Sequence, residues 1–595
     1  MSMSKNIARL AVTAGLTAAL SFGGVMAPVT MAFAEGTPTV AQSGNVTITE
    51  STYKDTTFKG IQIFKATVTQ DIKDYAWNGD KTLSDIEWAG GENGSVKNAV
   101  IHAFDKVAAD SKPTDLPTDN SAQAWAKFIN NHASEVVDNN VNAGTVLDMI
   151  ARALEGANIA EGQNGWQTSD NGAFNTLKTG YWLFVTKSVK TDSANQNTDA
   201  FTSPIFTIVG GADVNAEPKK DVPNVTKAVK DDATDGTFGD DVFAKPNMSA
   251  DSRMDQFIEY QLAGKVASNI NSYSTYTYSF TDSLPDSMTV ECGEDNSPVV
   301  AVKIDDNSVK ADPTSGYTTS YSDNKLTVSF ADLKSCVDEK GQKISVSGSS
   351  TVTVEYKAKL DSAKIFDNNG NIKNDFQGLV GKAQTNTVKL TYSNNPHNTD
   401  STGTTVTHPA YDYTYGIDVT KVGSDTDETG KHKTLEGVQF TLQEKDSSEF
   451  IKADGTTTST KDDAILTTDS NGKINVVGLD EGTYTLTEVT PAPGYNNSAA
   501  SGVTFTIASD SLPTNGDSFT PSCTLAEGTD KNLVYASNAT DGKVHLTVTD
   551  QKGSGLPLTG LNGVTFTWIA GGAVLVIGVA HLIRSRKQAE ESEQE

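Results

Sequence analysis

The chain has few cysteines. Its 595 residues include three, Cys292, Cys336 and Cys523. Extracellular proteins that rely on disulfides usually carry more, so disulfides cannot be the main covalent support of this chain. Cys292 and Cys336 fall within one expected domain and are a candidate disulfide pair, which would leave Cys523 over. The sequence does not decide whether they pair.

Motifs of common enzymes are also missing. The seven histidines form no His-Glu-x-x-His zinc site, and no Gly-x-Ser-x-Gly nucleophile elbow occurs. Residues 367–375, DNNGNIKND, are similar to a calcium loop, but Gly370 stands at position four instead of six and no glutamate closes the loop. We therefore expect a polar turn there, no metal, no cofactor and no enzymatic activity on other molecules.

Positive charge is scarce as well. Lys and Arg number 47 against 75 Asp and Glu, which gives a net charge of -28. Such acidity repels phosphate backbones and anionic lipid surfaces, so nucleic acid is not an expected partner.

What the sequence does contain is an apolar segment near each end. Residues 561–583 hold no Asp, Glu, Lys or Arg, and the basic residues Arg584, Arg586 and Lys587 follow. A helix of this length reaches ~34 Å at ~1.5 Å per residue, enough to cross a ~30 Å hydrocarbon layer. The basic flank favours the cytoplasmic side. We expect a C-terminal transmembrane helix.

The N-terminus has the pattern of a secretory signal peptide. Lys5 and Arg9 precede a mostly apolar run, and the small residues of AFA end at Ala34. We expect residues 1–34 to be removed by cleavage after Ala34. Everything between the two apolar segments would then lie outside the cell.

The sequence LPLTG stands immediately before the C-terminal apolar segment. With the basic tail, it resembles the sorting signal of Gram-positive surface proteins. The resemblance is carried by Leu556, Pro557, Thr559 and Gly560. It implies that a sortase cuts between Thr559 and Gly560 and passes the threonine carboxyl to an amine, on peptidoglycan or on another subunit. The membrane helix would then be a temporary anchor.

The exported part is long enough for three domains. Residues 35–216 begin and end with alternating strands and carry two patches of helical periodicity between them, whereas residues 217–409 and 410–552 are almost wholly strand-like. We call these ranges the first, second and third domains. They predict a mainly β protein of tandem immunoglobulin-like β-sandwich domains, with helical insertions in the first. Residues 553–595 hold the sorting signal, the transmembrane helix and the tail.

Three strands of the third domain each direct an ionisable side chain inward. Lys421, Glu488 and Asp550 share the parity of core residues in their strands. One interpretation is a buried salt bridge, or edge positions that are not truly buried. The other is chemistry, since an apolar pocket favours a neutral amine and a protonated acid. The amine could then attack the Asp550 carboxyl with Glu488 as proton shuttle, forming an isopeptide bond and releasing water.

Several segments of this domain resemble the collagen-adhesin B-type, or SpaA-like, pilin domain. They are TLEGVQFTL, GLDEGTYTLTEVTPAPGYN and LTVTDQK. In that family the lysine lies in the first strand, the acceptor in the last and the glutamate in a Tyr-x-Leu-x-Glu box. The resemblance therefore implies an isopeptide bond between Lys421 and Asp550, with Glu488 as the acid. The acceptor is more often Asn, so Asp550 is a departure.

The second domain repeats the arrangement. PNVTKAVK, YSFTDSLPD and YSNNP resemble the fimbrial isopeptide-forming domain of backbone pilins. The resemblance implies a bond between Lys227 and Asn394, with release of ammonia and Asp282 as the acid. Lys230 could replace Lys227 and Asn395 could replace Asn394, but both face the wrong way. No comparable trio is expected in the first domain.

The linker between the first and second domains contains two adjacent lysines. In backbone pilins the lysine that attacks the sortase intermediate lies here, in a Tyr-Pro-Lys-Asn motif. This chain keeps only Pro218 and Lys219 of that motif, so Lys219 is the predicted polymerisation lysine and Lys220 the alternative.

Together the resemblances imply the major subunit of a covalently polymerised pilus, or fimbria, on the cell wall. A class C sortase would join Thr559 of one copy to a lysine of the next, and the fibre would support adhesion and colonisation. Expected partners are the sortase, further copies of the chain, minor tip or base pilins and peptidoglycan. The alternative is a monomeric wall-anchored adhesin or a minor tip pilin. The sequence names no host ligand.

Overall fold

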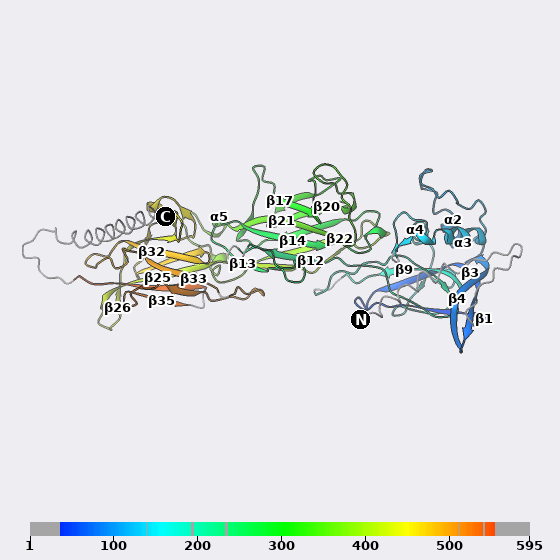
Figure 1. Cartoon of the computed structure of the whole chain (residues 1–595), viewed down its shortest axis with the longest axis horizontal. Coiled ribbons are helices and arrows are strands. Elements are labelled where there is room, and N and C mark those ends of the chain that lie inside the picture. Colours follow the sequence, from blue (N-terminus) through cyan, green and yellow to red (C-terminus); the bar gives the residue numbers. More distant parts are fainter. Residues whose placement is uncertain are drawn as a thin grey trace, which may run out of the picture.

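The structure is a computed structural model that describes residues 36–137, 140–191, 195–231, 236–509, 511–538 and 542–553. The expected signal peptide, LPLTG signal, membrane helix and basic tail lie outside these ranges. Within them, no helix combines the length and the apolar character needed to cross a membrane. The described chain is mainly β, as the sequence predicted. It is also elongated, and its groups of sheets follow one another along the longest axis (Figure 1).

In the residues that the structure describes, the first domain combines three sheets with three α-helices. Its elements are β1 (Thr37–Val40), β2 (Gly44–Ile48), β3 (Thr57–Lys73), β4 (Ala76–Trp88), α2 (Ser95–Ile101), α3 (Ala122–Asn131), η1 (Ala133–Glu135), β5 (Val136–Val137), β6 (Asn140–Val141), α4 (Val146–Gly156), β7 (Gln167–Thr168), β8 (Ala173–Leu177), β9 (Gly180–Ser188), β10 (Ile205–Val209) and β11 (Val214–Ala216). One sheet has the order β1-β3-β9-β10, with β4 and β7 also on β3. A second has the order β11-β2-β8, and β5 pairs with β6 in a small two-stranded sheet.

The helices of this domain form where the sequence predicts them. Their apolar side chains recur every three to four residues, and Trp125 of α3 and Leu147 of α4 are buried in one core with the larger sheet. Ser121 and Thr145 cap α3 and α4, because their hydroxyl oxygens accept hydrogen bonds from backbone N–H groups of the first turn. The predicted helical insertions are therefore confirmed.

The second domain is a sandwich of two sheets. Its elements are β12 (Val225–Val229), β13 (Ser249–Asp251), β14 (Ile258–Lys265), η2 (Ile270–Ser272), β15 (Tyr278–Ser283), β16 (Met288–Val290), β17 (Val300–Ile304), β18 (Asn307–Ser308), β19 (Thr318–Ser322), β20 (Lys325–Phe330), η3 (Leu333–Ser335), β21 (Thr351–Leu360), α5 (Ser362–Ile365), η4 (Asn374–Phe376), β22 (Gln384–Ser393), β23 (Thr402–Thr404) and β24 (His408–Tyr413). The sheet orders are β12-β14-β21-β17-β18, with β16 on β21, and β13-β24-β22-β15-β20-β19, with β23 on β22.

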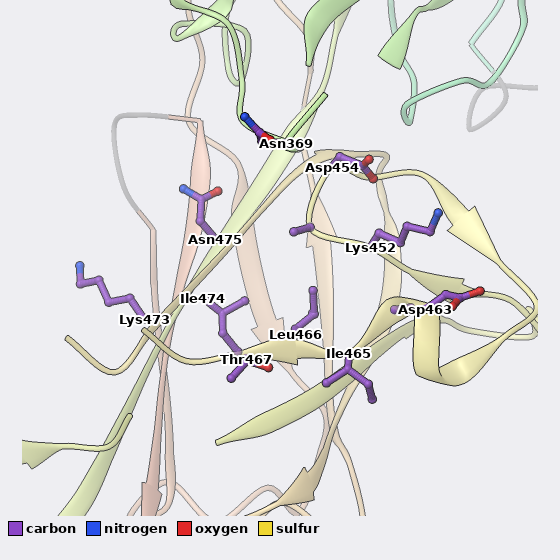
Figure 2. Close-up of a pocket in the computed structure, with 13 residues that line it drawn as sticks. Asn369, Lys452, Asp454, Asp463, Ile465, Leu466, Thr467, Lys473, Ile474 and Asn475 are labelled. Atoms are coloured by element: carbon purple, nitrogen blue, oxygen red, sulfur yellow. The ribbon is translucent and has the colours of Figure 1, made fainter. Parts of the chain in front are cut away.

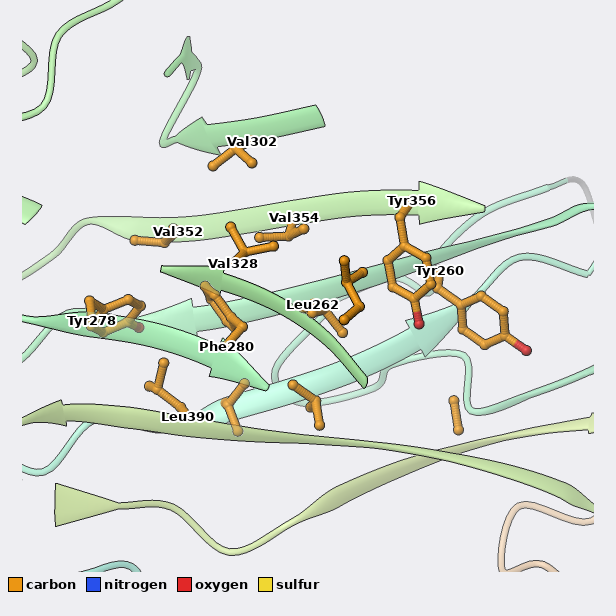
Figure 3. Packing of buried hydrophobic residues seen from close by; sticks show 14 of the residues in the cluster. Tyr260, Leu262, Tyr278, Phe280, Val302, Val328, Val352, Val354, Tyr356 and Leu390 are labelled. Atoms are coloured by element: carbon orange, nitrogen blue, oxygen red, sulfur yellow. The ribbon is translucent and has the colours of Figure 1, made fainter. Parts of the chain in front are cut away.

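The core of this sandwich is rich in tyrosine. Figure 3 shows Tyr260 and Tyr356 on one side of the cluster and Tyr278 with Phe280 on the other, among valines and leucines. The last strand, β24, crosses the expected boundary at residues 409 and 410, because it pairs with β22 and β13 as far as Tyr413.

The third domain is a second sandwich. Its elements are β25 (Tyr415–Thr426), β26 (His432–Thr434), β27 (Gln439–Glu444), β28 (Phe450–Ile451), β29 (Thr457–Thr458), η5 (Lys461–Ala464), β30 (Leu466–Thr467), β31 (Lys473–Leu479), β32 (Gly482–Thr490), β33 (Val503–Ala508), β34 (Ser522–Leu525), β35 (Val534–Asn538) and β36 (Lys543–Asp550). The sheet orders are β26-β25-β36-β35, with β31 on β25, and β29-β28-β27-β32-β33-β34, with β30 on β27. The first and last strands, β25 and β36, are parallel neighbours.

Polar contacts connect successive domains. Between the second and third, Met254 N–H donates to Gly478 O at 2.9 Å, and Glu481 N–H donates to the Asp251 carboxylate at 3.3 Å. Burial raises the pKa of Asp251 to about 7.

Between the first and second domains, side chains of helix α4 contact the turn after β22. Arg152 donates to Pro396 O at 2.7 Å and to both oxygens of Asp148 at 3.0 and 2.9 Å. His397 Nε2 lies 3.3 Å from Asp148 Oδ1, and its Nδ1 contacts Glu155. Burial disfavours the imidazolium of His397, but the hydrogen bonds and charges of these two acids outweigh it and raise its pKa.

This junction should weaken with rising pH. Because the folded-state pKa of His397 is raised, its stabilising contribution is complete below about pH 6.5, the ordinary value, and is lost as pH rises through the raised pKa. Hydrogen exchange of α4 amides, corrected for intrinsic rates, should therefore be slower at acidic than at alkaline pH. His397→Ala should remove most of this difference. An unchanged pH profile in that variant would show that His397 does not control the contact.

Candidate functional site

The third domain buries one lysine between two acids, as the strand pattern predicted. Lys421 Nζ lies 2.9 Å from Glu488 Oε2 and 2.6 Å from Asp550 Oδ1. The exposed fractions of the three residues are 0, 2 and 0 %. The amine also lies 5.5 Å from the centre of the Phe440 ring. All three groups are therefore withdrawn from water, so they are not exposed positions at the edge of a sheet.

Strand register explains how the lysine and the aspartate meet. In the parallel pair of β25 and β36, Lys421 stands opposite Val548 and Gly423 opposite Asp550. Since side chains alternate between faces, Asp550 is the next inward position after Val548. Glu488 comes from β32 in the facing sheet and completes the cluster.

The protonation state of this cluster suits acid catalysis. Burial is the largest cause that raises the pKa of Glu488 to about 7, the Lys421 charge opposes it, and Asp550 raises it further. Among the described residues, no donor reaches Glu488 Oε1 or Asp550 Oδ2. A proton on Glu488 would supply a hydrogen-bond donor to Asp550. This hydrogen bond is one cause of the raised pKa of Glu488. The site can therefore hold a protonated acid beside an amine.

The second domain buries a similar cluster. Lys227 Nζ, on β12, lies 2.7 Å from both carboxylate oxygens of Asp282, on β15, and 2.8 Å from the Tyr356 hydroxyl. Lys227 and Asp282 are 1 and 0 % exposed. Burial lowers the pKa of Lys227 to about 8 against the attraction of Asp282, and burial raises the pKa of Asp282 against the attraction of Lys227. Tyr356 also donates to Asp282.

The expected acceptor of this cluster, Asn394, is elsewhere. Its amide donates to Asp199 O at 3.1 Å, and its Oδ1 accepts from Ser401 at 2.8 Å. Asp282 stands opposite Val388 on β22, so Asn394 lies six positions farther along, about 20 Å at the strand rise. Asn394 follows the end of β22 and contacts the first domain, and its register does not bring it to Lys227.

Asn386 occupies the place that Asn394 was expected to fill. It shares the inward face of β22, two residues from Val388, and is fully buried. Its Nδ2 donates to the Tyr356 hydroxyl at 2.8 Å, the same oxygen that Lys227 contacts. Its Oδ1 accepts no hydrogen bond within the described ranges. The sequence NTVKLTY contains the signal that identifies Asn386 as an inward-facing residue, because it alternates in step with the core residues Val388, Leu390 and Tyr392.

Lys230 and Asn395 do not enter the cluster either. Lys230 pairs with Glu259 at the surface, and Asn395 Oδ1 accepts from the N–H of His397 at 2.9 Å. The candidate disulfide is not formed, because Cys292 and Cys336 are free thiols. Cys336 is buried in the core, whereas Cys292 is exposed.

A third lysine–acid cluster lies at the end of the first domain, where none was expected. Lys220 Nζ lies 2.7 Å from Glu50 Oε2 and 2.6 Å from Asp199 Oδ2. These side chains are 6, 12 and 0 % exposed. The three residues lie outside strands, so they have no alternation from which to predict their direction. Glu50 and Asp199 belong to the first domain, and Lys220 comes from the linker.

The neighbouring lysine is placed differently. Lys219 is half-buried, and within the described part of the chain no hydrogen bond or ion pair holds its amine. Its backbone carbonyl accepts from Ser203 N–H at 2.7 Å, which fixes the linker at this point. The amine of Lys219 is therefore the more available of the two predicted polymerisation lysines.

A pocket of about 380 Å³ lies where a loop of the second domain meets the third (Figure 2). Asn369 and Gly370 of that loop face Lys452, Asp454 and strands β30 and β31. None of the lysine–acid clusters lines this pocket, so the chemistry described above is separate from it.

Comparison with known proteins identifies one domain. The SpaA family, described as a prealbumin-like fold domain, matches residues 416–518, which include Lys421 and Glu488. No curated protein sequence matches the chain.

Several solved structures to which the chain is similar are those of major or backbone pilins. The T6 backbone pilin of Streptococcus pyogenes is 15 % identical over 86 % of this chain and 99 % of that chain, with a TM-score of 0.45. The major pilin SpaD of Corynebacterium diphtheriae is 14 % identical over 86 % of this chain and 98 % of that chain, with a TM-score of 0.41. The major pilin BcpA of Bacillus cereus is 17 % identical over 67 % of this chain and 90 % of that chain, with a TM-score of 0.34.

Proposed function

We propose that the chain is the major structural subunit of a pilus whose copies are joined covalently by a sortase. The observation that carries this proposal is the Lys421–Glu488–Asp550 cluster, which connects the first and last strands of the SpaA-type domain. A second buried lysine–acid cluster in the preceding domain supports it. Two such domains in an elongated chain suit a subunit that bears tension along its axis.

In the third domain, the amine of Lys421 attacks the Asp550 carboxyl carbon. Overall, one ammonium and one carboxylate become an amide and one water, and Glu488 transfers the protons that the nitrogen gives up to the departing oxygen. The raised pKa of Glu488 supports this role, because an acid that titrates near neutrality can both take and give a proton. The product joins strands β25 and β36 through an amide.

In the second domain, we assign Asn386 as the acceptor in place of Asn394. Lys227 attacks the amide carbon of Asn386, Asp282 transfers the proton, and ammonia leaves. The shared contact of Lys227 and Asn386 with Tyr356 supports this assignment. The lowered pKa of Lys227 supports it further, since a larger fraction of the amine is neutral and nucleophilic.

Polymerisation requires an accessible amine and a sorting signal. We propose Lys219 as the amine and Thr559 as the residue joined to it, after cleavage of LPLTG between Thr559 and Gly560. The burial of Lys220 between two acids supports Lys219, since a sortase acyl-enzyme cannot approach an enclosed side chain. Minor tip and base pilins, peptidoglycan and an adhesive role belong to the same proposal.

The third-domain bond should be visible in the intact mass. The wild-type chain should lack one water at this site, and Glu488→Ala should retain it. The variant should also unfold at a lower temperature, because a cross-link between residues separated by 129 positions contributes about 5 kcal/mol in a loop-entropy estimate. Glu436→Ala, at an exposed glutamate of the same domain, is the matched control and should behave as wild type. Linear, unmodified peptides at both Lys421 and Asp550 in a digest of the wild-type chain would refute the bond.

The second-domain acceptor can be identified with two pairs of variants. Asn386→Ala should retain the ammonia that wild type loses, whereas Asn394→Ala should still lose it. Asn386→Asp should have the wild-type mass, because loss of water from an acid and loss of ammonia from an amide give the same product. Asn394→Asp should be heavier than wild type by the difference between an acid and an amide. The reverse pattern would restore Asn394 as the acceptor.

Immunoblots of wall extracts test polymerisation. Wild-type cells should show a ladder of high molecular weight, and Lys219→Ala cells should show only wall-linked monomer, because Thr559 is untouched. Lys190→Ala, at an exposed lysine of the first domain, is the matched control and should keep the ladder. A single band in wild type would favour a monomeric wall-anchored adhesin, and a full ladder in Lys219→Ala would exclude this lysine.

A further inference from the structure

We propose that Lys220 forms a third isopeptide bond, to Glu50, with Asp199 as the proton-transfer acid. This bond would join the first domain to the linker that leads into the second. The three side chains place one amine between two carboxyl groups, at 2.7 Å from Glu50 Oε2 and 2.6 Å from Asp199 Oδ2. The arrangement matches the third-domain cluster, where the distances from the amine are 2.9 and 2.6 Å.

The hydrogen bonds distinguish the acceptor from the acid. Glu50 Oε1 accepts from the backbone N–H groups of Thr52 at 3.1 Å and Tyr53 at 3.3 Å. Two such donors polarise a carbonyl and stabilise the negative charge that develops on its oxygen during attack. The other oxygen, Oε2, faces the amine. Glu50 is therefore prepared as an acceptor, with one oxygen held and the other directed toward the nucleophile.

Asp199 has the surroundings of a proton carrier. Its Oδ1 accepts from Ala200 N–H at 2.7 Å, and its Oδ2 accepts from the Thr56 hydroxyl at 2.5 Å and from Lys220. These contacts fix the carboxyl group in place. Burial raises the pKa of Asp199, against the attraction of Lys220, so its protonated form is favoured relative to an exposed aspartate.

Tyr53 contributes an aromatic ring to the surroundings of the amine. The Lys220 amine lies 5.1 Å from the centre of the Tyr53 ring. Burial and the charges of Asp199, Glu50 and Asp221 raise the pKa of the Tyr53 phenol to about 12, so the ring carries no charge at neutral pH. An aromatic face in this position keeps the amine and acids in an apolar setting, which favours amide formation over ion pairing in water.

The reaction balances without an external reagent. The amine of Lys220 attacks Cδ of Glu50, a new C–N bond forms, and the bond from Cδ to Oε2 breaks. Overall, one ammonium and one carboxylate become an amide and a water. The two protons that the ammonium gives up leave with Oε2, and Asp199 carries one of them across. No atom is oxidised or reduced.

Peptide mapping of the full chain by tandem mass spectrometry tests this bond. The digest should contain a branched peptide that joins the segment around Glu50 to the segment around Lys220 and is lighter by one water than the two linear segments together. Linear peptides at both positions would overturn the proposal and identify a buried ion pair. A branch at Asp199 would overturn the assignment of the acceptor. Branches in the second and third domains are read in the same digest, so failure here is distinguishable from failure of the proposed function.

Two variants test the assigned roles, and a third is the matched control. Asp199→Asn should leave the two segments linear, because the proton carrier is lost, and a persistent branch would exclude this role. Glu50→Gln should give a branched peptide of wild-type mass, since release of ammonia from the amide yields the same product. Lys190→Ala removes an exposed pair with Asp55 in the same domain and should keep the branch. Loss of the branch in that control would show that the link depends on general stability of the domain.

Discussion

The structure depends on the burial of lysine amines beside carboxyl groups in apolar interiors. Removing one charged group from water costs several kcal/mol unless a partner is present, so each buried lysine requires its acids in fixed positions. The sandwiches provide those positions, because inward-facing residues of neighbouring strands are held a few ångströms apart. Lys421 meets Asp550 across a parallel strand pair and Glu488 from the facing sheet. Lys227 meets Asp282 across the sandwich. The same burial that would make an ion pair expensive favours the neutral amine and the protonated acid.

The sequence predicts the direction of a side chain in a strand more reliably than its position along the strand. Alternation placed Lys421, Glu488, Asp550, Lys227 and Asp282 inward, and the structure brings each set together. Alternation also placed Asn394 inward, but an even shift along a strand preserves parity, so it could not separate Asn394 from Asn386. Only the strand register, in which Asp282 stands opposite Val388, distinguishes Asn386 from Asn394. The helical patches of the first domain were predictable because their apolar spacing and capping residues agree.

Residues outside strands and helices had no periodic signal. Glu50, Asp199 and Lys220 are far apart in the sequence, and their meeting depends on the path of the segment after β9. Asn394 helps to fix that path, since its backbone carbonyl accepts from Phe201 N–H at 2.7 Å and its amide donates to Asp199 O at 3.1 Å. The residue expected to be an acceptor in one cluster therefore positions an acid of another. Between domains, the contacts include hydrogen bonds, such as Arg152 to Pro396 O, and aromatic packing of Tyr413 against Phe519, whose ring centres are 5.2 Å apart.

The parallel pairing of β25 and β36 has a mechanical consequence. A pull that enters the third domain at Tyr415 and leaves beyond Asp550 would pass, with the proposed bond in place, through residues 415–421 and then directly into Asp550. The residues from 422 to 549 would carry no tension. Fully extended, this segment would measure about 430 Å at ~3.4 Å per residue, several times the length of a folded domain. Because this segment bears no force, it would not unfold and lengthen the fibre under load. The fibre would therefore be nearly inextensible.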